Sequence, residues 1–182
     1  MNLLAFAATN SVHSINKTLV KWASHRFVTE LNPDAEVTLL DLNDFDMPVY
    51  AIDRQMDTGI HPHAQKFFQH IGAADAIIVS FAEHNGLMTA AWKNLFDWMS
   101  RIDAQVWQGK SIAMFAATPG PRAGAGVLGT LAQLTPFFGG TIVGKHGVGE
   151  WNKAWDETAG DLTRDADKEA IMSALRALNE TA

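Results

Sequence analysis

The sequence contains no cysteine. This absence excludes disulfide bonds, metal sites built on thiolates and a cysteine nucleophile. The sequence also has no uninterrupted apolar run of about 18 residues, the length from which a membrane-spanning helix is recognised. The apolar start at residues 1–6 is much shorter, and no basic segment precedes it. We therefore expect a buried strand there, and a cytoplasmic protein with no membrane partner.

The chain has fewer basic than acidic residues. Its 14 lysines and arginines and 20 aspartates and glutamates give a net charge of −6. Nucleic acids and anionic membranes bind clustered basic surfaces. We therefore expect neither as the main partner, although backbone N–H groups can still bind a small anion locally. The length of 182 residues suits one domain, so we expect a single domain over residues 1–182.

Five apolar segments alternate with segments that have helical spacing. This alternation is typical of an α/β fold whose parallel sheet is covered by helices on both faces. Two strand orders are compatible with it, 2-1-3-4-5 and the order of dinucleotide-binding folds. The expected strands cover residues 3–8, 36–42, 76–81, 111–117 and a fifth that begins at 141–143; the expected helices cover 19–31, 62–71, about 90–102, 125–138 and 171–178; a long loop is expected over 43–60 and irregular structure over 148–166.

Short polar side chains follow the first expected strand, at residues 9–16. Open α/β sheets bind ligands beyond the carboxyl ends of their strands, where the strand order reverses. The chain enters a helix here, and the unpaired N–H groups and partial positive charge of a helix start favour an anion such as a phosphate. The alternative is that Ser14 or Asn16 only caps the helix. The candidate binding residues are Thr9, Ser11, Ser14, Ile15 and Asn16.

The loop at residues 82–88 follows the third expected strand. Asn85 and Gly86 favour a tight turn whose backbone groups can face the edge of a flat ring, with His84 beside that ring. The alternative is a plain turn with an exposed histidine. An acid/base pair of Glu83 and His84 is less favoured, because adjacent residues after a strand point in opposite directions. The candidate binding residues are Glu83, His84, Asn85 and Gly86.

The loop at residues 118–124 follows the fourth expected strand and contains two prolines and two glycines. Such a composition favours a rigid, shaped turn. Arg122 is the one fixed positive charge in the predicted pocket, where it faces either a ligand or only solvent. The candidate binding residues are Thr118, Pro119, Gly120 and Arg122.

Two further patterns resemble known binding motifs, but their sequence context does not favour a binding site. Residues 124–129 fit a dinucleotide-binding fingerprint, with Glu150 at a suitable distance, but a proline-rich loop separates them from the preceding strand. Small residues that let a helix pack tightly on the sheet explain this run better. His61 and His63 flank a proline and have no third ligand nearby, so we expect a surface turn and no metal site.

The expected helix at residues 90–102 is apolar over most of its circumference, with Trp92, Phe96 and Trp98 among its residues. A core helix needs only one apolar stripe. The excess indicates a subunit interface, and the alternative is a helix well buried within one subunit. Trp151 and Trp155 lie one turn apart in the acidic segment, where they either cover the ligand or pack on the core.

The three loops resemble those of the NADPH-dependent FMN reductase family. That family shows glycine-serine-x-arginine-x-x-serine-x-asparagine after its first strand; here Ser14 and Asn16 match, whereas Thr9, Ala8 and Ser11 replace serine, glycine and arginine. The second motif, proline-glutamate-tyrosine-asparagine followed by glycine or serine, is met at Glu83 and residues 85–86. Its continuation, lysine-asparagine-x-x-aspartate-tryptophan, is matched fully at residues 93–98, and residues 118–124 resemble serine-proline-glycine-x-arginine-x-glycine.

This resemblance, which covers residues 1–150, implies a flavodoxin-like three-layer sandwich with strand order 2-1-3-4-5. It implies FMN as cofactor, with its phosphate on the first loop and its ring on the other two, and NAD(P)H as electron donor. The acceptor would be a small molecule such as a quinone or free flavin. Because the flavin carries the chemistry, no catalytic side chain is expected. Members of the family form dimers or tetramers, so the resemblance implies a homodimer or homotetramer, here through the helix containing Trp92 and Asp97.

Three rival functions stay open on the sequence. A flavodoxin-like electron carrier is compatible with the acidic balance, which suits docking to a basic partner. A flavin-free regulatory relative is compatible with Ala8 and Ser11, and an ordinary dehydrogenase would use residues 124–129. The choice between NADH and NADPH is also open, because Ser11 removes one expected charge and Arg122 retains another.

Overall fold

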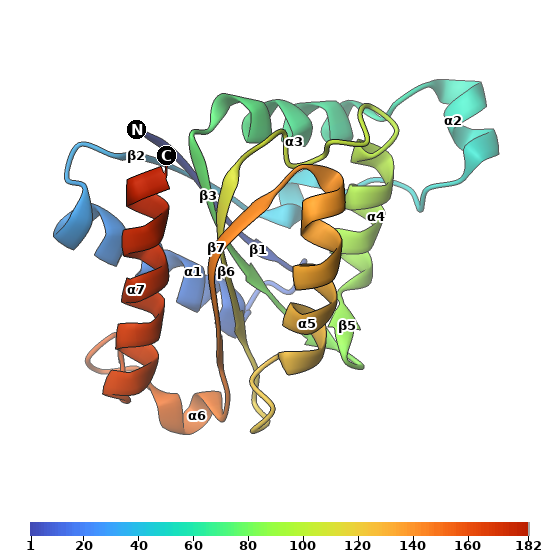
Figure 1. The fold of residues 1–182 in the computed structure, drawn as a ribbon. Helices are drawn as coiled ribbons and strands as arrows, with labels where there is room; N and C mark the ends of the chain where they lie inside the picture. Colours follow the sequence, from blue (N-terminus) through green and yellow to red (C-terminus); the bar gives the residue numbers. More distant parts are fainter. Residues whose placement is uncertain (182) are drawn as a thin grey trace.

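Five parallel strands lie at the centre of the structure, a computed structural model that describes residues 1–181 (Figure 1). They lie in the order β2-β1-β3-β6-β7. Counted among these five strands alone, this is the order 2-1-3-4-5, so the flavodoxin-like prediction is confirmed. The strands are β1 (Asn2–Ala8), β2 (Glu36–Leu40), β3 (Ala76–Phe81), β6 (Ser111–Ala117) and β7 (Thr141–Val148).

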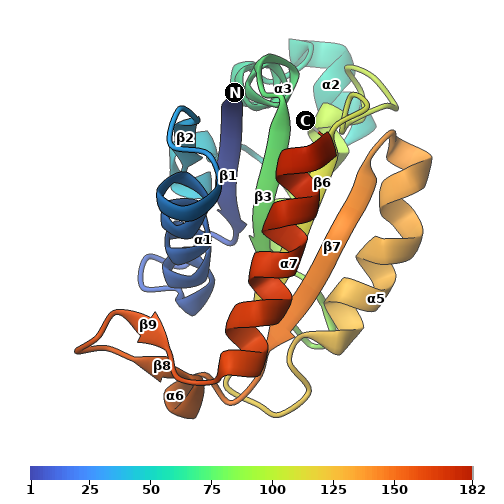
Figure 2. The ribbon, with the colours of Figure 1, turned by 60° about the vertical axis from the view of Figure 1, so that its left-hand side comes forward.

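Helices cover both faces of this sheet (Figures 1 and 2). Successive residues of a strand point to opposite faces, so β1 supplies Phe6 to one core and Ala5 to the other. Strands buried on both faces need continuous apolar runs, which is why β1 and β3 are recognisable in the sequence. On one face lie α3 (Pro62–Ala73), α4 (Ala90–Met99) and α5 (Ala125–Leu134), and on the other α1 (Ile15–Arg26) and α7 (Asp165–Thr181).

Several boundaries differ from the predicted ones for local reasons. Strand β2 ends at Leu40, because the Asp41 side chain accepts a hydrogen bond from the Asn43 N–H (3.0 Å) and begins the 3₁₀ turn η2 (Leu42–Phe45). Helix α4 ends at Met99, before residue 102. The predicted ends at residues 31 and 138 are correct, because the turns η1 (Phe27–Leu31) and η3 (Thr135–Phe138) extend α1 and α5.

Two segments predicted as loop or irregular structure contain regular elements. Residues 43–60 include α2 (Ile52–Thr58), and residues 148–166 include α6 (Trp151–Ala154) and the hairpin of β8 (Trp155–Asp156) and β9 (Asp161–Leu162), which Figure 2 shows beside α6. Helix α2 buries none of its residues, so it lacks the apolar stripe from which a helix is predicted. None of the helices within the described residues is long and apolar enough to cross a membrane.

Helix α4 is apolar on more than one side because two parts of the same chain cover it. Trp92 is buried, and its ring stacks with those of Phe6 and Trp107 at centroid distances of 5.2 and 5.6 Å. On another side, Trp98 Nε1 donates a hydrogen bond of 2.9 Å to the carbonyl oxygen of Pro48. Burial within one subunit, the alternative to a subunit interface, therefore accounts for Trp92 and Trp98.

Candidate functional site

Three loops enclose a cleft of about 380 Å³ at the carboxyl edge of β1, β3 and β6, the lower edge of the sheet in Figure 1. This volume falls within the range of small-molecule sites, about 300–1,000 Å³. The loops are the three that the sequence singles out. The cleft is lined by Thr9, Ser11, His13, Ser14, Ile15, Asn16, Ala82, Glu83, His84, Ala117, Thr118 and Pro119.

The first loop begins α1 with groups suited to an anion. Ser14 caps the helix, because its Oγ accepts a hydrogen bond from the Asn16 N–H at 3.2 Å. The capping interpretation of Ser14 is therefore correct, and it leaves the hydroxyl hydrogen able to donate. The N–H of Ile15 has no acceptor among the described residues, as is usual for the first N–H groups of a helix. Ser11, Ser14 and Ile15 line the same cleft, next to the positive end of α1.

Asn16 has a different role from its neighbours. Its Oδ1 accepts hydrogen bonds from Ser80 Oγ (2.7 Å) and from the Ala117 N–H (2.8 Å), and its Nδ2 donates to the Ala117 carbonyl (3.0 Å). The side chain is buried and joins the first turn of α1 to β3 and β6. Asn16 thus holds the cleft together, and its amide is already bonded.

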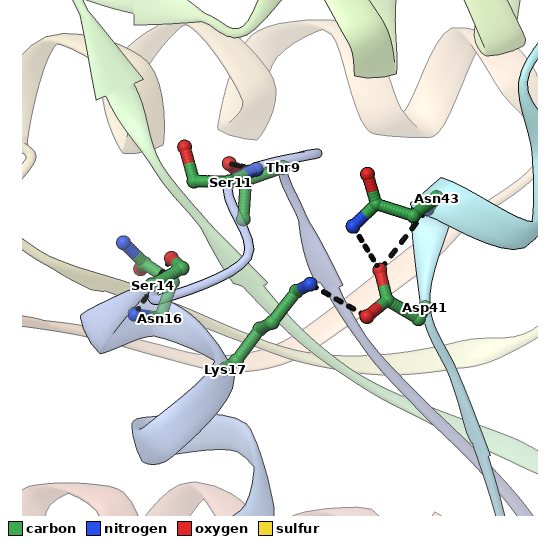
Figure 3. Close-up of polar contacts among 7 residues, drawn as sticks. All are labelled: Thr9, Ser11, Ser14, Asn16, Lys17, Asp41 and Asn43. Carbon is green, nitrogen blue, oxygen red and sulfur yellow. Dashed lines mark hydrogen bonds and ion pairs between the residues drawn. The ribbon is translucent and has the colours of Figure 1, made fainter.

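Lys17, the cation next to this loop, is paired with a carboxylate outside the cleft. Its Nζ lies 2.6 Å from Asp41 Oδ2, and Figure 3 shows the side chain running from α1 to Asp41. Partial burial disfavours the charged form of Asp41. The hydrogen bonds from Lys17 and Asn43 outweigh this effect and hold the pKa of Asp41 below its ordinary value. The pair fixes α1 to the end of β2.

The second loop is a hairpin of β4 (Glu83–His84) and β5 (Leu87–Met88). Its two turn residues, Asn85 and Gly86, have φ angles of 54° and 82°. Positive φ at both positions is typical of a type I′ turn, so the predicted tight turn is confirmed. His84 is exposed and lines the cleft, whereas the two turn residues do not line it.

The carboxylate of Glu83 is bound to α5. Its Oε1 accepts a hydrogen bond of 3.1 Å from the Val127 N–H, in the first turn of that helix, where a negative charge is favoured. The hairpin lies so close that a Cβ on Gly126 would be 2.6 Å from the Gly86 carbonyl oxygen and 2.7 Å from Glu83 Oε1. Close packing therefore explains the glycine at 126, and the dinucleotide interpretation of residues 124–129 is not needed.

The third loop contributes its first two residues to the cleft. Thr118 and Pro119 line the cleft, whereas Gly120 and Arg122 do not. The carbonyl of Gly120 accepts hydrogen bonds from Thr118 Oγ1 and from the Glu150 N–H, both at 3.0 Å. Arg122 is exposed, so the one fixed charge that the sequence assigned to the pocket lies outside its lining.

Three residues that line the cleft are absent from the predicted set. Ala82 and Ala117 lie at strand ends, where the sequence pattern of an apolar residue predicts only that it belongs to the core. His13 is exposed within the first loop, between Ser11 and Ser14. Its position in a loop already assigned to the site was the signal that could have identified it.

Trp151 and Trp155 pack on the core and do not line the cleft. Their rings stack at 5.2 Å with an interplanar angle of 12°, and Trp151 is buried in the core between the sheet and helices α1 and α7. The Trp151 N–H donates to the Thr118 carbonyl at 3.1 Å. Trp151 therefore holds the third loop through this backbone hydrogen bond without lining the cleft.

The motif at residues 93–98 also acts through packing. Lys93 and Asp97 form an ion pair of 2.6 Å along the helix. Asn94 Oδ1 accepts the N–H of Tyr50 at 2.8 Å, and its Nδ2 donates to the carbonyls of Met47 and Pro48 at 3.2 Å. Together with Trp98, Asn94 thus holds residues 47–50 against α4 without lining the cleft.

Comparison with known proteins agrees with this geometry. The family described as NADPH-dependent FMN reductase matches residues 1–154. An NAD(P)H-dependent FMN reductase of Pseudomonas aeruginosa is 30% identical over 151 residues, which cover 80% of this chain and 78% of that protein. A quinone reductase of Escherichia coli is 27% identical over 100 residues, which cover 55% of this chain and only 53% of that protein.

The fold is shared with solved structures at lower identity. The flavoenzyme FerB of Paracoccus denitrificans, an NAD(P)H:(acceptor) oxidoreductase, superimposes with a TM-score of 0.77 at 20% identity, covering 99% of this chain and 96% of that one. The match over residues 1–154 includes all three loops of the cleft. The chain therefore belongs to the NADPH-dependent FMN reductase family.

Proposed function

We propose that this protein is an FMN-dependent NAD(P)H oxidoreductase that passes electrons to a small acceptor such as a quinone or free flavin. The observation that carries the proposal is the cleft at the start of α1. Ser11, Ser14 and Ile15 line this cleft in a member of the FMN reductase family, and the Ile15 N–H has no acceptor among the described residues. Helix starts of this kind bind phosphate without a lysine or arginine.

The cleft residues divide into two groups in this proposal. Ser11, Ser14 and Ile15 bind the FMN phosphate, and Thr9 orders their loop by accepting the Ser11 N–H at 3.2 Å. His84 and residues 118–119 frame the ring on the far side of the cleft. The predicted residues Asn85, Gly86, Gly120 and Arg122 are proposed to shape the hairpin and third loop.

Bound FMN would supply the redox chemistry, accepting hydride from NAD(P)H and returning electrons to the acceptor. The protein then contributes position, electrostatics and access, and no side chain is assigned a catalytic role. We also propose a cytoplasmic location, because reduced nicotinamide nucleotides are intracellular metabolites.

The test is a spectrum of the purified protein after FMN addition and gel filtration, followed by NAD(P)H oxidation with a quinone. Retained flavin that NAD(P)H bleaches, with rapid oxidation when quinone is present, supports the proposal. Retained flavin with almost no NAD(P)H oxidation indicates an electron carrier. Protein that takes up no flavin overturns the proposal; if it still binds nicotinamide nucleotide it is a dehydrogenase, and if not, a regulatory relative.

We further propose that the protein is a homodimer or homotetramer through the face that contains α4. An apolar groove of about 270 Å³ lies between α4, α5 and η3, lined by Phe96, Leu134 and Phe138 among others. Phe137, which precedes the groove residue Phe138 in η3, is 76% exposed. Lys93 and Asp97 lie among the groove residues and supply a polar margin. A second copy covering this face would bury apolar surface that one chain leaves in water.

A further inference from the structure

A second pocket, of about 330 Å³, lies beside the cleft at the carboxyl ends of β1 and β2. Its volume falls within the range of small-molecule sites, about 300–1,000 Å³. Asn10 lines this second pocket, whereas its neighbours Thr9 and Ser11 line the cleft, so the two sites share the loop that follows β1. The second pocket is lined by Asn10, Leu42, Asn43, Phe45, Asp46, Met47, Ala91, Asn94 and Leu95.

The second pocket combines apolar and polar lining residues. Those that are buried are apolar, namely Leu42, Phe45 and Leu95. Those that are exposed are polar, namely Asn10, Asn43 and Asp46. A molecule that joins a flat ring to a hydroxylated part matches both sets, because the ring can pack on the apolar residues while the hydroxyls bond to the polar ones. A nucleoside has this chemistry.

The exposed lining residues have polar groups that no other described residue occupies. Neither the Asn10 amide nor the Asp46 carboxylate has a hydrogen-bond or ion-pair partner among the described residues, and only the carbonyl of Asp46 is bonded, to His63 Nδ1 at 2.8 Å. Asn43 Nδ2 donates to Asp41 Oδ1 at 2.8 Å, which leaves the Asn43 side-chain oxygen free to accept. Amides both donate to and accept from hydroxyl groups, and a carboxylate accepts from them.

The charge of the second pocket is negative. Asp46 is the one charged residue among the described residues that line it. Lys17, close by, is paired with Asp41 at 2.6 Å (Figure 3). Lys66 Nζ lies 5.8 Å from the centre of the Phe45 ring, but Lys66 does not line the pocket. An anionic group bound here would therefore meet a carboxylate and no lining cation.

Resting on the proposed function, we propose that the second pocket binds the adenosine part of the electron donor and that Asp46 makes the protein prefer NADH to NADPH. The ribose of NADH has a free 2′-hydroxyl, which donates a hydrogen bond to a carboxylate. NADPH carries a 2′-phosphate instead, with a charge of about −1.5 to −2, which Asp46 repels. This preference is opposite to the one that the description of the family, NADPH-dependent, names.

The experiment is steady-state kinetics of the FMN-loaded full chain with a quinone acceptor at low salt, comparing kcat/KM for NADH with kcat/KM for NADPH. Asp46→Asn removes the charge and keeps the size of the side chain, whereas Asp46→Arg replaces the carboxylate with a cation. The matched control is Asp44→Asn, which removes an exposed carboxylate from the same 3₁₀ turn without changing a lining residue. Circular dichroism and the content of bound FMN check that each variant is folded.

The wild type and Asp44→Asn should both prefer NADH. Asp46→Asn should lower this preference by about threefold to tenfold, mainly through a lower KM for NADPH, since one exposed carboxylate no longer repels the phosphate. Asp46→Arg should lower it further. A wild type that prefers NADPH, or an equal ratio for the wild type and Asp46→Asn, would overturn the inference while leaving the proposed function intact. Bound flavin that neither nucleotide reduces would overturn the proposed function itself.

Discussion

Replacing Asn16 with alanine tests whether this residue holds the three loops of the cleft together. The side chain is only 2% exposed. It receives hydrogen bonds from Ser80 Oγ and the Ala117 N–H and donates one to the Ala117 carbonyl, at 2.7, 2.8 and 3.0 Å. The substitution leaves three polar groups of β3 and β6 without this partner, at a point where Ser80 is fully buried.

The magnitude follows from those three groups. A buried polar group left without a partner costs about 1–3 kcal/mol. Since the space vacated by the amide can admit a water molecule that satisfies part of the loss, we expect Asn16→Ala to lower the free energy of unfolding by about 3–5 kcal/mol. Ser80→Ala removes one bond and leaves Asn16 bonded to Ala117, so its cost should be about 1 kcal/mol.

The assay is urea denaturation followed by circular dichroism, on flavin-free wild type, both single variants and the double variant. The double variant should lose less than the sum of the single losses, because Ser80→Ala removes one of the groups that Asn16→Ala leaves unpaired. A loss below about 1 kcal/mol for Asn16→Ala would refute the reasoning, since three buried groups would then have found other partners at no cost.

Three further predictions follow from contacts elsewhere. Gly126→Ala should destabilise the protein by about 1–3 kcal/mol and weaken flavin binding, because the new methyl displaces the β4–β5 hairpin. Gly129→Ala in the same helix, with nothing within 4 Å of the new methyl, should instead stabilise by about 0.5–1 kcal/mol, and equal losses in the two variants would contradict the packing argument. Because the pKa of Asp41 lies below its ordinary 3.8, its stabilising effect is complete above that pH and is lost as pH falls through the lower native value. The difference in urea midpoint between wild type and Asp41→Asn should therefore shrink from pH 5 to below 3.8, and a constant difference would exclude the Lys17 pair as its cause. Phe137→Glu should convert an oligomer to monomer in sedimentation without loss of helical signal, and an unchanged sedimentation coefficient would place the interface elsewhere.

The parallel sheet could be predicted from the sequence because its central strands are buried on both faces. Residues 76–81 form a continuous apolar run, and that run is β3. Helix α2 could not be predicted, since it projects from the body and buries no side chain (Figure 1). Periodicity records burial against a core, so an element that contacts no core leaves no period in the sequence.

The site was predictable to the level of loops, but not of individual side chains. The carboxyl edge of the sheet follows from topology, and all three predicted loops do line the cleft. The roles of Asn16 and Glu83 depend on where β6 and α5 lie in space, which spacing along the chain does not encode. The sequence pattern of a polar residue in a ligand-binding loop is the same whether its side chain contacts the ligand or hydrogen-bonds to the protein and positions the loop.

The contacts of Asn94 and Trp98 on α4 have a consequence for engineering this protein. Both side chains bond only to backbone atoms of residues 47–50: one N–H and two carbonyls. These hydrogen bonds fix the path of the backbone, and the ring of Tyr50 adds an edge-to-face contact with Trp98 at 5.2 Å. Ile52 and Met56 are exposed and take no part in this anchor, so a library can vary these two positions while Asn94, Trp98 and Tyr50 stay fixed.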